Sequence, residues 1–350
     1  MRKKVIGLLL LTAIMLVSGG IYLLGQRKQA VTVSGYLGGE KIGFFEDEER
    51  ADILKERYGL EADYSKAGSL DMITADLEGR DYLFPSSSIA LEYYEDLHGK
   101  PLQNETILNT PIVLYTHRIV LDALVEQGAA ETVEDVNYVD MNKLVDLIQK
   151  EIHWKDIGVE ELYGKVSVDT TDPASSNSGN MFAALLADIL NGGETPTQAD
   201  LGEVLPKLQD IFGKLGYMET SSADLFSQFL KMGVGATPIA AGYESQIIEY
   251  AVMEPEDYQA VKDDIVILYP TPTVWSTHVM IALDENGQAL LEALLDEEIQ
   301  ELAWDRHGFR TESGGSIQGD LPVSGIAPSI TSVAPIPDYE VMKQIIDGLA

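Results

Sequence analysis

The chain contains no cysteine among its 350 residues, and this absence removes several chemistries together. Disulfide bonds, thiolate metal sites and cysteine nucleophiles all depend on that side chain. Histidine is scarce as well: the five histidines are scattered, with neither a close pair nor an H-E-x-x-H pattern. A G-x-S-x-G nucleophile elbow is also missing. We therefore predict no catalytic residue, no metal site and no cofactor. A secreted serine hydrolase stays open as an alternative, because the members of a serine triad need not be neighbours in sequence.

The chain has few basic residues relative to acidic ones. The chain has 24 lysines and arginines against 57 aspartates and glutamates, which gives a formal net charge of −33. Such a surface repels nucleic acids and anionic membranes, so we expect no polyanionic partner. A charged, well-solvated surface also favours solubility. We expect a monomer that binds no nucleic acid.

Acidic residues are absent from the first 28 positions, where the basic residues 2–4 precede an uncharged, mostly apolar run at residues 5–25. As a helix this run would span about 31 Å, close to the ~30 Å hydrocarbon core of a bilayer. The charge ahead of it favours an exported remainder. Residues 16–20 look like a bacterial lipoprotein signal with glycine in place of the lipidated cysteine. We therefore predict that residues 1–29 form a membrane anchor, with a cleaved signal peptide as the alternative.

From residue 30 the chain repeats a strand, a small polar turn and a helix. The first three turns hold Gly38 and Gly39, then Ser69, then Ser86, Ser87 and Ser88. Repetition of this unit predicts a parallel sheet covered by helices. Because open sheets of this kind bind ligands beyond the carboxyl ends of their strands, the three turns are expected at one edge.

Residues 165–193 contain the strongest candidate for a ligand contact. A short strand leads into a turn of hydroxyl, amide and glycine residues, Ser175 to Gly179, and a helix is predicted to begin near Ser178. The first amides of a helix have no partner within it and lie at its positive end, so they can hold an acceptor or an anion. A similar turn later in the chain carries Tyr243 and Ser245.

Several short stretches give the chain a resemblance to a known family. They are the turns at residues 68–69 and 86–88, the segment 172–179, the turn 242–245 and the segment 296–309. In this order they resemble the type II extracellular solute-binding proteins, the superfamily of molybdate and sulfate binders. The resemblance implies a two-lobed α/β fold with a mostly parallel, helix-flanked sheet in each lobe. Two crossing strands, at residues 111–116 and 277–283, would join the lobes, and hinge motion would close the cleft.

The resemblance also implies a division of the chain and a function. Residues 30–112 and 277–350 would form lobe 1, and residues 113–276 would form lobe 2. The cleft would capture a small polar or anionic solute, an oxyanion among the candidates, and deliver it to an ABC-type membrane permease. The alternative is a ligand sensor or adaptor for a membrane partner. The implied ligand contacts are Gly38, Gly39, Ser69, Ser86, Ser87, Ser88, Ser175, Ser176, Asn177, Ser178, Gly179, Tyr243 and Ser245.

Overall fold

The computed structural model describes residues 30–311 and 321–350. The predicted anchor, residues 1–29 with its apolar run 5–25, lies outside the described residues. Within the two described ranges, no helix has the length and apolar character needed to cross a membrane.

The first lobe is built on three parallel strands, as the repeated strand and turn units predict. β1 (Val31–Leu37) pairs with β2 (Leu60–Lys66) on one side and with β3 (Tyr82–Phe84) on the other. Each strand ends at the same edge, so the turns that follow them meet there. The connecting helices are η1 (Gly39–Lys41), α2 (Ile42–Glu46), α3 (Glu48–Ile53), η2 (Leu54–Tyr58), α4 (Asp71–Thr74) and α5 (Ser88–His98).

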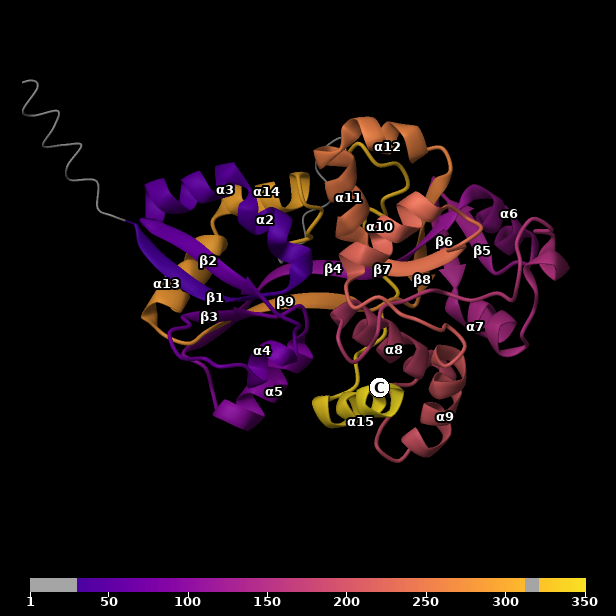
Figure 1. The fold of residues 1–350 in the computed structure, drawn as a ribbon, viewed down its shortest axis with the longest axis horizontal. Helices are drawn as coiled ribbons and strands as arrows, with labels where there is room; N and C mark the ends of the chain where they lie inside the picture. The colour runs from indigo at the N-terminus through magenta and orange to yellow at the C-terminus, as the bar shows by residue number, and fades with distance from the viewer. Residues whose placement is uncertain (1–29, 312–320) are drawn as a thin grey trace, which may run out of the picture.

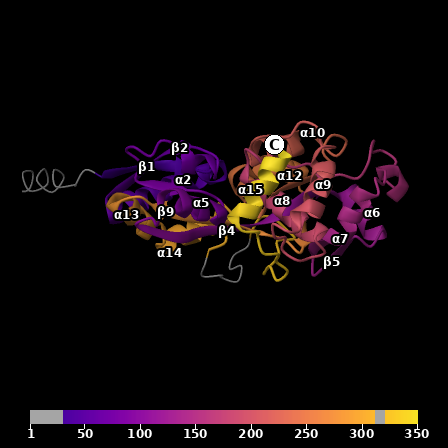
Figure 2. The ribbon, with the colours of Figure 1, turned by 90° about the horizontal axis from the view of Figure 1, so that it is seen from below.

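Two long antiparallel strands join the lobes, β4 (Gln103–His117) and β9 (Trp275–Ala282). In Figure 1 both run from the group formed by β1–β3 into the group that contains β7, β8 and α8. β4 belongs to the sheets of both lobes. Residues 103–111 pair with β9, and residues 112–117 pair with β7 and β8. The hydrogen-bonded path therefore continues through eight of the nine described strands, with β7 paired to β4 beside it, while the helices gather in two groups (Figure 2).

The second lobe departs from the expected mostly parallel sheet. β7 (Ile239–Tyr243) and β8 (Ile265–Thr271) are both antiparallel to β4, and β5 (Ala130–Val133) is antiparallel to β6 (Val136–Asp140). Only the β6–β8 pair in this sheet is parallel among the described strands. The reason is that β4 arrives from the first lobe as a central strand, and later strands run back against it. The fold is mixed α/β.

Helices cover both faces of the second sheet. One apolar core, centred on Leu114, Leu185 and Leu268, packs under α8 and α9; another, containing Tyr115 and Phe229, packs under α10 and α11. The helices are α6 (Arg118–Glu126), α7 (Met141–Gln149), η3 (Trp154–Ile157), α8 (Asn177–Leu190), α9 (Leu201–Phe212), α10 (Ser222–Met232), α11 (Glu244–Met253) and α12 (Pro255–Val261).

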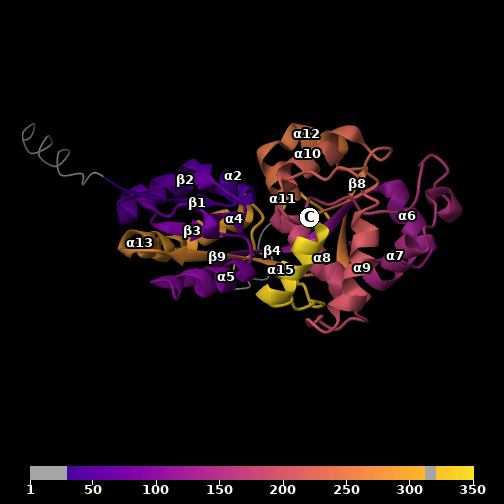
Figure 3. The same cartoon turned by 60° about the horizontal axis from the view of Figure 1, so that its bottom comes forward.

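The C-terminal part of the chain is divided between the lobes. α13 (Glu285–Leu294) and α14 (Glu297–Asp305) contribute to the core of the first lobe. α15 (Tyr339–Leu349) instead lies beside α8 and α9 (Figure 3), and its apolar face belongs to the second-lobe core. We expected residues 277–350 in lobe 1 as one block. This packing favours moving residues 321–350 to lobe 2, and the lobe boundaries stay a proposal.

Candidate functional site

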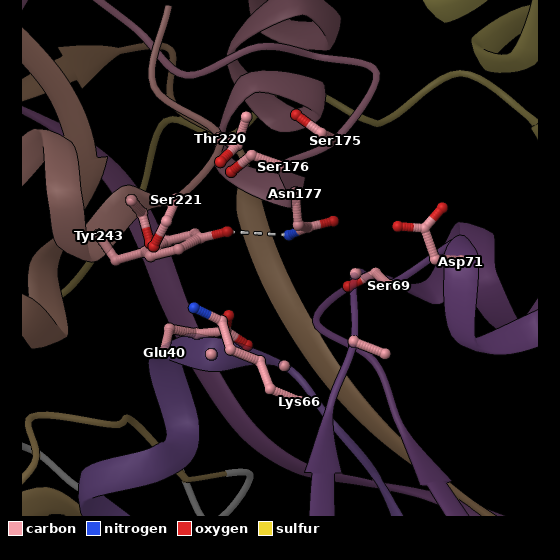
Figure 4. Close-up of a pocket in the computed structure, with 15 residues that line it drawn as sticks. Glu40, Lys66, Ser69, Asp71, Ser175, Ser176, Asn177, Thr220, Ser221 and Tyr243 are labelled. Atoms are coloured by element: carbon pink, nitrogen blue, oxygen red, sulfur yellow. Dashed lines mark hydrogen bonds between the residues drawn. The ribbon is translucent and has the colours of Figure 1, made fainter.

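A cavity of about 370 Å³ lies between the two lobes. The first lobe contributes the turns after β1 and β2, and the second contributes the turn before α8, the turn before α10 and the end of β7 (Figure 4). The lining residues are Gly38, Gly39, Glu40, Lys66, Ala67, Gly68, Ser69, Asp71, Ser175, Ser176, Asn177, Thr220, Ser221, Ser222 and Tyr243.

Helix α8 directs its N-terminus at this cavity. It begins at Asn177, one residue before the predicted start, and Ser176 precedes it in an extended conformation without capping the helix through its side chain. A Cβ at Gly179 would clash with the carbonyl oxygen of Thr171, so only glycine permits this close packing. Within the described chain the backbone amides of residues 177–179 have no hydrogen-bond partner. The helix therefore offers free donors at its positive end.

Asn177 connects the two lobes across the cavity. Its Nδ2 donates to the carbonyl oxygen of Ser86 at 2.9 Å and to the hydroxyl of Tyr243 at 3.0 Å. Ser86 follows β3 in the first lobe, whereas Asn177 and Tyr243 belong to the second. Figure 4 shows the bond between Asn177 and Tyr243 at the centre of the cavity. Burial raises the pKa of Tyr243, so its hydroxyl stays protonated and can donate to a ligand.

A buried ion pair supports the first-lobe wall. The Lys41 ammonium contacts the Glu40 carboxylate and also donates to Ser86 Oγ at 2.7 Å and to His278 Nδ1 at 3.0 Å. Burial alone would raise the pKa of Glu40, but Lys41, His278 and the hydrogen bonds from Lys41 and Ser86 lower it to about 2. Burial lowers the pKa of Lys41, and the Glu40 carboxylate opposes that change. Glu40 is therefore ionised, and the cluster fixes its carboxylate beside the cavity.

Two further charged residues line the cavity without partners. Neither the ammonium of Lys66 nor the carboxylate of Asp71 has a hydrogen bond or an ion pair among the described residues. Lys66 is the last residue of β2, and Asp71 is the first of α4. The sequence predicted a wall of neutral donors and missed these charges. Their positions gave a usable signal, because both flank the Gly68–Ser69 turn that was selected.

The structure brings together seven of the thirteen predicted contacts. They line the cavity from both sides and are Gly38, Gly39, Ser69, Ser175, Ser176, Asn177 and Tyr243. A second group that sequence reasoning missed, Thr220 to Ser222, comes from the turn before α10. That turn has small hydroxyl residues at a helix start, the same signal that selected the turn before α8.

The other six predicted contacts lie outside the cavity lining and have structural partners nearby. Ser178 Oγ bonds Thr171 Oγ1 at 2.7 Å and Ser176 Oγ at 3.1 Å, and Gly179 packs behind it. The amide of Ser245 donates to Thr110 Oγ1 at 3.2 Å. Their part in binding stays a prediction.

The serines of the turn after β3 form hydrogen bonds within the first lobe and do not line the cavity. The Ser86 amide donates to Ser69 Oγ at 2.9 Å, and the Ser86 hydroxyl accepts from the Lys41 ammonium. Ser87 caps α5 by accepting from the Ile89 amide at 3.2 Å, and Ser88 is the first residue of that helix. The hydroxyls of Ser86 and Ser87 therefore stabilise the first-lobe wall from outside the cavity lining.

One serine and one histidine lie close enough to test the hydrolase alternative. Ser276 Oγ and His278 Nε2 are 3.4 Å apart, and both side chains are fully buried. Because the Lys41 ammonium donates to Nδ1, the proton of the neutral ring lies on Nε2, which therefore cannot accept the proton of Ser276. The Ser276 hydroxyl instead donates to the carbonyl oxygen of Ser86 at 2.7 Å. This pair lacks the arrangement of a nucleophile and its base.

No protein-family model and no curated protein matches the sequence. Solved structures do match. An extracellular solute-binding protein from Bordetella parapertussis superposes with a TM-score of 0.60 at 13% identity, over 92% of this chain and 97% of its own. The fold is that of the two-lobed solute-binding proteins.

Two further structures with this fold have named ligands. The periplasmic binding protein AfuA from Actinobacillus pleuropneumoniae, bound to fructose 6-phosphate, gives a TM-score of 0.58 at 13% identity over 91% of this chain and 97% of its own. The sulfate-binding protein SubI from Mycobacterium tuberculosis gives 0.51 at 13% identity over 81% and 87%. At this identity the likeness concerns the fold, and the ligand has to be inferred from the cavity itself.

Proposed function

We propose that this chain is an extracytoplasmic solute-binding protein that captures a small polar solute between its lobes and delivers it to an ABC-type permease. The observation that carries the proposal is the interlobe cavity, whose lining comes from both lobes at the ends of strands and the starts of helices. Attachment to the membrane through residues 5–25 is part of the proposal. The shared fold of solute-binding proteins supports the solute-binding part of the proposal.

The donors in the cavity suit an anionic group on the solute. The Lys66 ammonium, the free amide of Asn177 at the start of α8 and the hydroxyls of the second-lobe turns all present positive or donating groups. Phosphate and carboxylate groups bind well at helix N-termini of this kind. We therefore assign one end of the solute to these groups.

The carboxylates in the cavity call for a second kind of group. Glu40 and Asp71 can accept hydrogen bonds but cannot donate them when ionised, so they would repel an ion that carries only acceptor oxygens. Hydroxyl groups on the same solute would satisfy them. Of the two ligand types named for the similar folds, a phosphorylated polyol therefore fits better than sulfate. We propose a polyhydroxylated solute with one phosphate or carboxylate group.

Closure of the cleft would depend on contacts between the lobes. The bond from Asn177 to the Ser86 carbonyl already links the two walls at 2.9 Å. A solute that touches both walls binds the closed form better than the open form and shifts the population toward it. In this way the binding of a small molecule would bring the protein into a closed shape that a permease can recognise.

The experiment is to identify what the full chain carries and what stabilises it. Mass spectrometry of the purified protein would detect a co-purifying solute, and thermal unfolding would be followed with fructose 6-phosphate, glycerol 3-phosphate, sulfate, molybdate and fructose. We expect the phosphorylated polyols to raise the melting temperature more than sulfate or fructose, because only they match both kinds of group. If sulfate or molybdate gives the largest rise, the polyol assignment is wrong. Turnover of the stabilising compound would contradict the binding function itself.

A further inference from the structure

A second cavity of about 250 Å³ lies in the second lobe and shares no lining residue with the interlobe cavity. Its walls come from the segment after α9, from α10, and from residues 236–237 next to β7. The lining residues are Asp169, Thr170, Leu215, Tyr217, Met218, Glu219, Leu225, Gln228, Met232, Ala236 and Thr237.

Asp169 places a carboxylate without a partner in this cavity. Two backbone hydrogen bonds hold Asp169 against β7. The Asp169 amide donates to the Ile239 carbonyl at 2.9 Å, and the Ala241 amide donates to the Asp169 carbonyl at 2.8 Å. No hydrogen bond or ion pair to its side chain is formed by any residue in the described ranges. Burial raises the pKa of Asp169 to about 6, so at neutral pH the carboxylate is ionised and poorly solvated. A bound cation would relieve that cost.

The surroundings of Asp169 carry no positive charge and combine polar with apolar side chains. Leu215, Met218, Leu225, Met232 and Ala236 form the apolar part of a mixed wall, and no lysine or arginine lines the cavity. At its rim Tyr217 is 81% and Met232 is 62% exposed, so both side chains are accessible to a ligand. An aromatic ring and a thioether are both polarisable surfaces that suit an organic cation.

One other titratable carboxylate faces this space. Glu219 lines the cavity, and its Oε1 accepts from Gln228 Nε2 at 3.3 Å, so it is partly satisfied within the protein. Tyr217 is the remaining titratable group of the lining. Glu219 adds to the negative potential, but Asp169 is the carboxylate that lacks a partner.

We propose that this cavity binds a small organic cation, a primary ammonium on a short alkyl chain. The ammonium pairs with the Asp169 carboxylate, and the alkyl chain lies against Leu225 and Met232. A hard metal ion is a poorer match, because Ca²⁺ and Mg²⁺ need six or more oxygen ligands and the described residues contain no group of three or more acidic or histidine side chains placed to hold a metal. The inference stands apart from the solute of the interlobe cavity, since the two sites share no side chain.

The test uses butylammonium chloride and the full chain, with binding measured by saturation-transfer NMR and calorimetry. Butanol and sodium butyrate have the same chain length without the positive charge and are expected not to bind. Because a cation binds the ionised form of Asp169, lowering the pH from 7.5 to 5 should weaken butylammonium about tenfold. Asp169→Asn should weaken it at least tenfold at pH 7.5 and remove the pH dependence. Glu219→Gln should change the affinity less than threefold.

Two further variants make the result decisive. Asp263→Asn removes an exposed carboxylate outside the cavity and should leave binding unchanged. Met232→Trp adds bulk at the exposed rim without altering the carboxylate and should weaken butylammonium at least fivefold, which keeps the test valid if Asp169→Asn does not fold. The proposal is overturned if butylammonium does not bind at 10 mM, if butanol binds equally well, or if neither Asp169→Asn nor Met232→Trp weakens binding.

Discussion

The first-lobe wall of the interlobe cavity carries three charged side chains, whereas the second-lobe wall is made of hydroxyls, an amide and free backbone donors. Glu40, Lys66 and Asp71 supply the charges of the first wall. Facing them are Ser175, Ser176, Asn177, Thr220, Ser221, Ser222 and Tyr243. Both walls begin from turns with the same small residues, so their difference comes from the residues next to each turn.

This difference suggests separate tasks for the two walls. Charges that stay in a fixed place can recognise the charge and hydroxyl pattern of a solute, and the Lys41 ion pair fixes Glu40. Neutral donors lose less hydration when they are brought over a solute than ionised groups do. The neutral wall is therefore suited to close over a solute that the charged wall has already selected.

The largest effect should come from breaking the ion pair under the charged wall. Glu40→Gln leaves the Lys41 ammonium buried without its counter-ion, which should lower the free energy of unfolding by about 3–5 kcal/mol. Urea denaturation at pH 7 measures this change. Glu56→Gln removes an exposed glutamate of the same lobe and should change the stability by less than about 0.5 kcal/mol.

The same pair predicts how stability depends on pH. The pKa of Glu40 is lowered to about 2 in the folded protein from an ordinary value of 4.5. Its contribution is therefore complete above about pH 4.5 and is lost as the pH falls toward 2. The parent protein should lose this increment between those values, and Glu40→Gln should lack it. An equal loss in both proteins would show that Glu40 carries no stabilising charge.

A smaller effect is expected from the contact that joins the walls. Asn177→Leu removes the donor shared by the Ser86 carbonyl and the Tyr243 hydroxyl, so among the described residues the Ser86 carbonyl keeps only the hydrogen bond from Ser276 and the Tyr243 hydroxyl loses its buried donor. The free energy of unfolding should fall by about 1–3 kcal/mol. Stabilisation by the solute should also disappear, because the leucine blocks the cavity at the start of α8.

Asn142→Leu supplies the matched control. Asn142 is exposed in the first turn of α7, far from the cavity lining, and its replacement should leave solute-dependent stabilisation unchanged. If Asn177→Leu retains the full stabilisation by the solute, the neutral wall does not take part in binding.

The position of the interlobe cavity was predictable from sequence because turns after strands and before helices have a local signature. Small polar residues after β1 and β2, and before α8, were selected on that signature, and residues from all three turns line the cavity. The same local reasoning predicted the start of α8 to within one residue. Local sequence fixes these features since they depend on neighbours in the chain.

The direction of side chains and strands depended on distant partners and was not predictable in this way. The turn after β3 is as rich in serine as the others, yet Lys41 and Ser69 draw Ser86 inward. The antiparallel second sheet follows from the long path of β4, which no local pattern records. Likewise, Lys66 flanks a turn that the sequence selected, but which side chains beside a turn line the cavity depends on the fold.

The smallest of these effects concerns a single exposed charge of the first wall. Lys66→Gln keeps a polar side chain that can still donate hydrogen bonds, one atom shorter than lysine, but removes its positive charge. Because Lys66 has no partner among the described residues, folding stability should change by less than about 0.5 kcal/mol. The affinity for a phosphorylated solute should fall about tenfold, which corresponds to about 1.4 kcal/mol, whereas a neutral polyol should be unaffected.

Titration calorimetry at 20 mM and 300 mM salt separates charge recognition from shape. The parent protein should bind the anionic solute more weakly at high salt, and Lys66→Gln should show a smaller dependence, because the ammonium is solvent-exposed and therefore screened. Lys55→Gln, at an exposed site on η2, should behave as the parent does. If Lys66→Gln and Lys55→Gln bind the anionic solute equally well, the charged wall does not select its ligand by charge, and the solute must be recognised through the helix amides and hydroxyls alone.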